Sequence, residues 1–69
     1  MNLDVQQGLN FLKKESSFLK IRGIRKLAQS KDRDARRILS EFLASKPPPE
    51  LVEATEEAIE ELEKYFNLI

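Results

Sequence analysis

The chain contains no cysteine, no histidine and no tryptophan among its 69 residues. Without cysteine it cannot form disulfides, and without cysteine and histidine it lacks the usual ligands of zinc. The same absences exclude a histidine general base and a cysteine nucleophile. We therefore predict that the protein is not an enzyme, and we expect neither a cofactor nor a metal site.

Long apolar runs are also missing. No such run approaches the roughly 20 residues that a membrane-spanning helix needs, and the first five residues, Met-Asn-Leu-Asp-Val, lack the basic flank of a signal peptide. We therefore expect one small domain, residues 1–69, located in the cytoplasm and without a membrane partner.

Apolar residues recur at helical spacing in four segments. The pattern predicts helices over residues 3–14, 17–29, 33–45 and 49–66. Asn2, Ser16 and Asp32 are suitable N-cap residues for the first three helices, and Pro49 suits the first position of the fourth. No segment alternates between apolar and polar residues over a sustained stretch, so we predict no strand.

The second predicted helix carries two apolar stripes, which predicts contact on more than one side. We assign Phe18 to the core as part of the stripe that also contains Ile21, Ile24 and Ala28. In the first helix Gly8 is unfavourable, because glycine costs about 1 kcal/mol relative to alanine inside a helix.

The two halves of the sequence echo each other. Residues 10–13 match residues 41–44 at an offset of 31, and residues 19–27 match residues 54–62 at an offset of 35. We therefore predict an all-α fold in which the four helices form two stacked antiparallel hairpins, about 3–29 and 32–66. Stacking would cover the apolar face that each hairpin leaves open. A generic four-helix bundle is the alternative.

Three segments of this pattern resemble HEAT repeats, most of all the short bacterial type of phycobilisome-lyase-like proteins. They are Ser-Ser-Phe-Leu-Lys-Ile-Arg-Gly-Ile-Arg-Lys-Leu at 16–27, Lys-Asp-Arg-Asp-Ala-Arg-Arg-Ile-Leu-Ser-Glu-Phe-Leu at 31–43, and Glu-Leu-Val-Glu-Ala-Thr-Glu-Glu-Ala-Ile-Glu-Glu-Leu at 50–62. The resemblance implies a fragment of an α-α superhelix that serves as a binding surface. The resemblance implies no catalytic residue in this sequence.

Charge is balanced overall but segregated along the chain. Residues 13–37 contain ten basic and three acidic residues, a net charge of +7, whereas residues 41–69 contain eight glutamates and two lysines, a net charge of −6. Three interpretations are open. The halves neutralise each other inside one fold, or the basic half of one molecule meets the acidic half of another, or the basic region binds nucleic acid.

The candidate functional residues follow from this segregation. We predict that a partner binds the basic residues Arg22, Arg25, Lys26, Arg33, Arg36 and Arg37. A nucleic-acid surface would use the same six residues together with Lys20. The three arginines at 33, 36 and 37 lie at a helix start, where positive charge is unfavourable. They are either scattered on the surface or paired with carboxylates of the fourth helix or of a partner.

The apolar C-terminus is a second candidate. Tyr65, Phe66, Leu68 and Ile69 either fold back over the end of the stack or form a contact between two copies of the chain. The glutamate pairs 56/60 and 57/61 each face one side of a helix, and we interpret them as a solvated acidic face. The sequence thus predicts a non-catalytic protein–protein interaction or scaffold module whose partner is another protein or a second copy. The alternative is a small nucleic-acid-binding protein.

Overall fold

The computed structural model describes residues 2–67, and in this range it contains four helices and no strand. The helices are α1 (Leu3–Leu12), α2 (Ser17–Ser30), α3 (Arg33–Ala44) and α4 (Pro49–Tyr65). The prediction of an all-α fold is confirmed. All four predicted starts agree with the structure, and the predicted ends differ from the observed ends by one or two residues.

The helix starts are fixed by local hydrogen bonds that the sequence makes visible. Asn2 Oδ1 accepts a hydrogen bond from the Val5 amide at 2.9 Å, and Ser16 Oγ accepts one from the Leu19 amide at 3.4 Å. Asp32 Oδ1 accepts one from the Asp34 amide at 2.9 Å. Each cap satisfies a backbone N–H that has no partner within its own helix, which is why short polar residues mark these starts.

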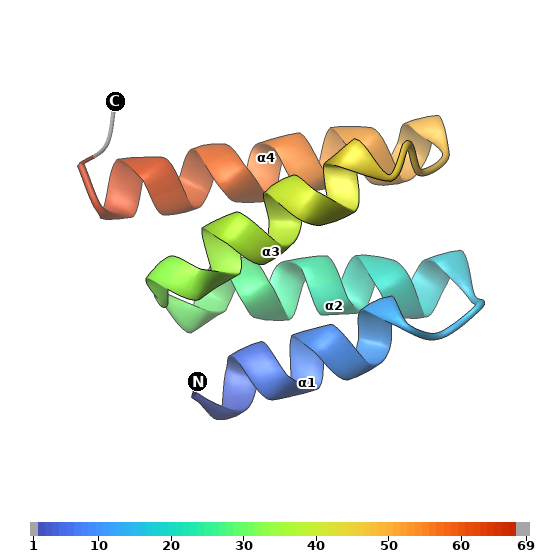
Figure 1. Cartoon of the computed structure of the whole chain (residues 1–69), viewed down its shortest axis with the longest axis horizontal. Helices are drawn as coiled ribbons and strands as arrows, with labels where there is room; N and C mark the ends of the chain where they lie inside the picture. The colour runs from blue at the N-terminus through green and yellow to red at the C-terminus, as the bar shows by residue number, and fades with distance from the viewer. Residues whose placement is uncertain (1, 68–69) are drawn as a thin grey trace.

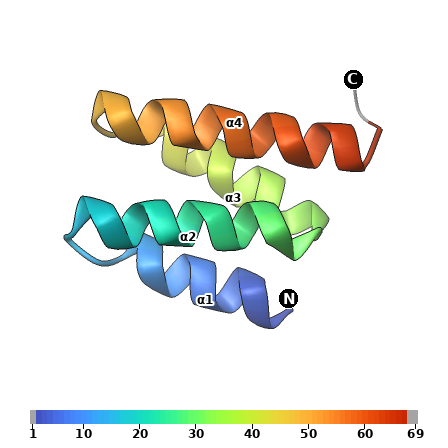
Figure 2. The same cartoon turned by 180° about the vertical axis from the view of Figure 1, so that it is seen from behind.

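The four helices form two antiparallel hairpins, α1–α2 and α3–α4, which pack on one another through α2 (Figure 1). Helices α2 and α4 lie side by side and run in the same direction. They are at the front of Figure 2, with α3 behind them and α1 against α2. The Cα atoms span 32 × 24 × 15 Å, so the stack is about two helices thick. The hairpin arrangement agrees with the prediction.

Residues from all four helices build one apolar core. Its fully buried large side chains include Val5 of α1, Ile24 and Leu27 of α2, Leu39 of α3, and Leu51 and Leu62 of α4. Thr55 is buried among them, and its hydroxyl donates a hydrogen bond to the Leu51 carbonyl at 2.6 Å. This bond compensates the cost of burying the hydroxyl.

Phe18 does not belong to this core, so its assignment from the sequence is wrong. Its side chain is 68% exposed. Phe18 lies in the first turn of α2, in helical register with Arg22 and Arg25, which are exposed as well. Ile24 and Ala28 of the predicted stripe are buried, so Phe18 lies at the solvent-facing edge of that stripe rather than in the core.

Two glycines let α1 and α2 approach closely. A Cβ atom added to Gly23 would lie 2.7 Å from the carbonyl oxygen of Gly8 and 2.8 Å from Cβ of Phe11. A Cβ atom added to Gly8 would lie 2.7 Å from Cγ of Leu27 and 3.0 Å from the Gly23 carbonyl oxygen. Both glycines are buried. Gly8 is therefore required by the packing of the hairpin, although it is unfavourable for the helix that contains it.

Polar side chains join this hairpin at both ends. The Asn2 side chain donates through Nδ2 to the carbonyl oxygen of Ser30 at 3.0 Å, which connects the start of α1 to the end of α2. At the opposite end, Lys20 Nζ donates to the carbonyl oxygen of Leu12 at 2.7 Å. This bond places a positive charge at the C-terminus of α1, where the helix dipole favours it.

The two hairpins are not packed alike. Helix α1 lies along α2, whereas α3 crosses α4 at a slant (Figure 1). Gly23 and Ala58, which the sequence echo aligns with each other, also have different neighbours. Gly23 meets α1 inside its own hairpin, and Ala58 lines a groove shared with α2 of the other hairpin.

Among residues 2–67, none of the helices combines the length and the apolar character that a bilayer crossing requires.

The glycine contact yields a prediction that opposes helix propensity. Replacing Gly23 with alanine favours the helical state by about 1 kcal/mol, but it forces Cβ into a backbone carbonyl, and overpacking of this kind costs about 1–3 kcal/mol. We expect Gly23→Ala to lower the free energy of unfolding by about 1 kcal/mol in urea titration. Ser40→Ala, an exposed helical control, should raise it slightly. Stabilisation by Gly23→Ala would contradict the close approach of α1 and α2.

Candidate functional site

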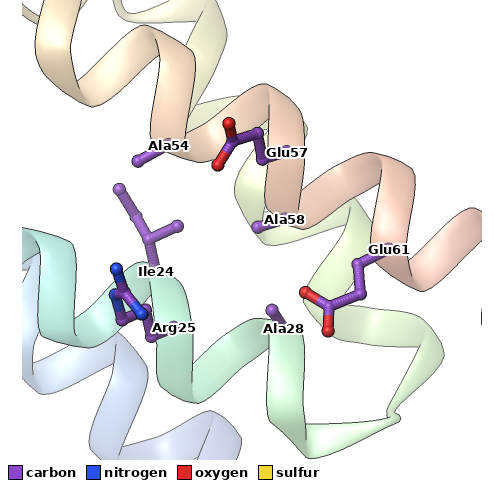
Figure 3. A pocket seen from close by; sticks show the side chains of 7 residues that line it. All are labelled: Ile24, Arg25, Ala28, Ala54, Glu57, Ala58 and Glu61. Atoms are coloured by element: carbon purple, nitrogen blue, oxygen red, sulfur yellow. The ribbon is translucent and has the colours of Figure 1, made fainter.

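A groove runs between α2 and α4 on the face shown in Figure 2, and Figure 3 shows it from close by. Its volume is about 130 Å³. We call it the α2/α4 groove, and its lining residues are Ile24, Arg25, Ala28, Ala54, Glu57, Ala58 and Glu61.

Small side chains create this groove. Ala28, Ala54 and Ala58 lie where the two parallel helices face each other, and Ile24 completes the apolar floor. Ile24, Ala28 and Ala58 are buried. Because methyl groups fill little space above the floor, the surface between the two helices is hollow rather than ridged.

Opposite charges form the two walls. Arg25 stands on the α2 side, and Glu57 and Glu61 stand on the α4 side (Figure 3). All three side chains belong to exposed residues. Among residues 2–67, no ion pair or hydrogen bond of these side chains is found, so the groove holds one cation and two anions without partners.

Each wall continues along its helix. On α2 the exposed residues Phe18, Arg25 and Gln29 follow one another at intervals of seven and four residues, so they form one stripe. Arg22 is turned toward α1 instead, where its guanidinium lies over the ring of Phe11. On α4 the exposed residues Glu50, Glu57 and Glu61 form a parallel acidic row at intervals of seven and four. The face therefore presents Arg25 and an acidic row on opposite sides of an apolar groove.

A second hollow, of about 340 Å³, lies between α1 and α2 and is basic. Its lining residues are Gln7, Asn10, Phe11, Lys14, Arg22 and Lys26. The guanidinium carbon of Arg22 lies 5.5 Å from the ring centroid of Phe11, within the range of a cation–π contact. Lys26 Nζ lies 3.8 Å from Asp4 Oδ1. Two of its three basic side chains therefore already have a contact within the chain.

A third hollow, of about 540 Å³, lies between α3 and α4 and is acidic. Its lining residues are Leu43, Glu56, Ile59, Glu60 and Glu63. The basic hollow therefore belongs to the first hairpin and the acidic hollow to the second. Two of the glutamates are paired within the chain, Glu60 with Lys64 at 3.0 Å and Glu63 with Arg36 at 2.6 Å.

The structure does not bring the six predicted partner-binding residues together. Arg25 lines the α2/α4 groove, and Arg22 and Lys26 line the basic hollow. The remaining three, on α3, are engaged inside the second hairpin. Arg33 lies over the ring of Phe66 at 4.9 Å, Arg36 pairs with Glu63, and Arg37 pairs with Asp34 at 3.8 Å and with Glu41 at 3.5 Å.

Of these contacts, the one between Arg36 and Glu63 joins two helices. Arg36 donates through Nη2 at 2.6 Å and through Nε at 3.1 Å to the same carboxylate oxygen. Of the alternatives open for this arginine, the structure shows pairing with a carboxylate of the fourth helix. The basic and acidic halves thus neutralise each other in part within one molecule.

The C-terminal aromatic residues have different environments. Phe66 is half-buried and packs against the core, as a tail that folds back would do. Tyr65 is 57% exposed, and its ring lies edge-on to Phe66 at 5.0 Å and beneath Lys31 Nζ at 5.2 Å. Leu68 and Ile69, the other predicted contact residues, lie outside the described residues.

The three hollows are lined by apolar, charged and amide side chains. Within residues 2–67, no cluster of three acidic side chains could hold a metal ion. Comparison with protein-family models, curated proteins and solved structures found no match to this chain. The resemblance to HEAT repeats therefore stays a prediction, and function must be argued from the surface itself.

The sequence predicts the acidic face of the fourth helix but not which residues lie across from it. The i, i+4 spacing of Glu57 and Glu61 shows that the two share one side of α4. Nothing in the sequence shows that this side borders α2 next to Arg25. Only the parallel packing of the two helices creates the groove.

The interaction energy between Arg36 and Glu63, which joins α3 to α4, can be measured. We expect a double-mutant cycle with Arg36→Ala and Glu63→Ala to give a coupling energy of about 0.5–1 kcal/mol, because the contact is short, shared by two N–H groups and half-buried. The same cycle for Arg37 and Glu41, an exposed i, i+4 pair, should give about 0.3 kcal/mol. A coupling for Arg36 and Glu63 no larger than that of the control would contradict their role in joining α3 to α4.

Proposed function

We propose that the protein is a non-catalytic protein-interaction module and that the α2/α4 groove with its charged walls is its docking surface. The observation that carries the proposal is the set of unpaired charges, Arg25 against Glu57 and Glu61, beside an apolar floor. Charges arranged in this way give orientation and selectivity to a protein contact, whereas the apolar floor excludes water.

The resemblance to HEAT repeats supports the same function. In that family, stacked helical hairpins present an extended surface to other proteins. Two parallel helices, one from each hairpin, form the docking surface here. We propose that the chain acts as a scaffold of this type in the cytoplasm.

Affinity capture from an extract of the native host tests this function. Wild-type chain should retain a defined set of proteins, and the variant Glu57→Arg/Glu61→Arg should lose them because it reverses one wall of the groove. The control is Glu56→Arg/Glu60→Arg, which makes the same charge change on the neighbouring side of α4 and should retain them. Equal retention by all three chains, measured by mass spectrometry, would remove the groove as the docking surface.

The exposure of Phe18 favours a second candidate, nucleic-acid binding. An aromatic ring beside Arg22 and Arg25 could stack on bases, while Lys20 and Lys26 of the same helix contact phosphates. Two observations argue against it. Lys20 already caps α1, and the acidic row of α4 lies across the groove from Arg25, where it would repel a phosphate backbone.

A mobility-shift measurement separates the two candidates. We expect the mobility of random duplex and single-stranded DNA to be unchanged by the protein at both 50 mM and 200 mM salt, since phosphate contacts are strongest at low salt. A shift at low salt that disappears at high salt would favour nucleic-acid binding over protein docking.

A further inference from the structure

We infer that the α2/α4 groove binds a second copy of this chain, in a two-fold symmetric dimer whose axis runs parallel to α2 and α4. This inference rests on the proposed function, because it names the partner that docks in the same groove. The observation behind it is that one face carries both halves of a complementary pair, Arg25 on one wall and Glu57 with Glu61 on the other.

The symmetry follows from the arrangement of the helices. A two-fold axis above the groove and parallel to it exchanges the two walls, so that α2 of one copy lies over α4 of the other. It also preserves the position of every residue along the groove. Arg25 lines the same short groove as Glu57 and Glu61 and is therefore at their level. It meets these two glutamates in the second copy, and the reciprocal contact forms at the same time.

Charge selects this arrangement over the other face-to-face dimer. A two-fold axis perpendicular to the helices would place α2 on α2 and α4 on α4. Arg25 would then lie on the same wall as Arg25 of the second copy, and the row of Glu50, Glu57 and Glu61 would oppose itself. Like charges held together in an interface are strongly unfavourable, so this arrangement is excluded.

The proposed dimer also covers the exposed phenylalanine. Phe18 lies six residues before Ile24 on α2, and Pro48 lies six residues before Ala54 on α4. Since Ile24 and Ala54 share the groove, Phe18 and Pro48 lie at a similar level about 9 Å further along it. In the dimer the ring of Phe18 therefore reaches the exposed prolines at the start of α4 in the second copy, which removes apolar surface from water.

Sedimentation velocity of the full chain over a range of concentrations tests the proposal. We expect wild type to shift from monomer to dimer and no further, and the shift should weaken as salt is raised. Arg25→Glu should raise the dissociation constant at least about tenfold, because it turns both reciprocal contacts into repulsions. Glu57→Arg/Glu61→Arg should do the same. The control Glu56→Arg/Glu60→Arg should dimerise as wild type does, and circular dichroism should show that every variant is helical.

Mixing the variants tests the symmetry itself. An equimolar mixture of Arg25→Glu with Glu57→Arg/Glu61→Arg should form a heterodimer, since a two-fold contact then joins opposite charges on both sides. Mixing Arg25→Glu with Glu56→Arg/Glu60→Arg should form a much weaker heterodimer, since one of its two reciprocal contacts joins the glutamate introduced at position 25 to Glu57 and Glu61, although that second variant has the same net charge as Glu57→Arg/Glu61→Arg. Heterodimers of equal affinity in the two mixtures, or a heterodimer in neither, would overturn the two-fold arrangement.

Two other results would also overturn it. Species larger than a dimer that disappear with Glu56→Arg/Glu60→Arg would show that the acidic hollow of one copy binds the basic hollow of the next, in an open chain. Wild type that stays monomeric up to millimolar concentration would show that the groove does not bind a second copy. If wild type stays monomeric but captures a different protein, and Glu57→Arg/Glu61→Arg does not capture it, the proposed function is supported although the dimer is not.

Discussion

The fold depends on close packing on both sides of α2. Helix α2 packs against α1, α3 and α4, so it must present an apolar flank to α1 and another to the second hairpin. On the first flank, Gly23 allows contact with the backbone of α1. On the second, Ile24 and Ala28 meet the alanines of α4. A chain of 69 residues buries little surface in absolute terms. Close packing between the helices therefore has to provide much of the stabilisation of the fold.

The same small residues that pack the helices also shape the surface. Alanines at positions 28, 54 and 58 keep α2 and α4 close and leave a hollow above them. The charged residues next to them on each helix, Arg25 on α2 and Glu57 and Glu61 on α4, then become the walls of this hollow. The functional proposal thus has a structural cause, because the groove exists where side chains are too small to fill it. Arg36 and Glu63, in contrast, neutralise each other and contribute to the second hairpin rather than to a docking surface.

Predictions from the sequence succeeded where a single helix decides the outcome. Asn2, Ser16 and Asp32 cap their helices through side-chain contacts within three residues, so spacing alone reveals them. Predictions failed where the environment of a residue depends on contacts between two helices. From the sequence alone, Gly8 is only unfavourable for its helix, and the structure adds that it contacts Gly23 of α2. Phe18 was assigned to the core because the spacing of apolar residues does not show which edge of an amphipathic stripe is covered by a neighbouring helix. The six basic residues suggested one surface, but they are divided among two hollows and the second hairpin.

The sequence by itself determined that the chain is helical, where each helix starts, and that charge is divided between its halves, because these properties depend on composition and on neighbours a few residues apart. Only the tertiary structure decided which charges remain unpaired. Arg36 forms an ion pair with Glu63 between α3 and α4, whereas Arg25 faces solvent in the groove that Glu57 and Glu61 also line. The physical reason is that an ion pair between helices forms only at a distance of a few ångströms. That distance is set by packing between residues far apart in the chain.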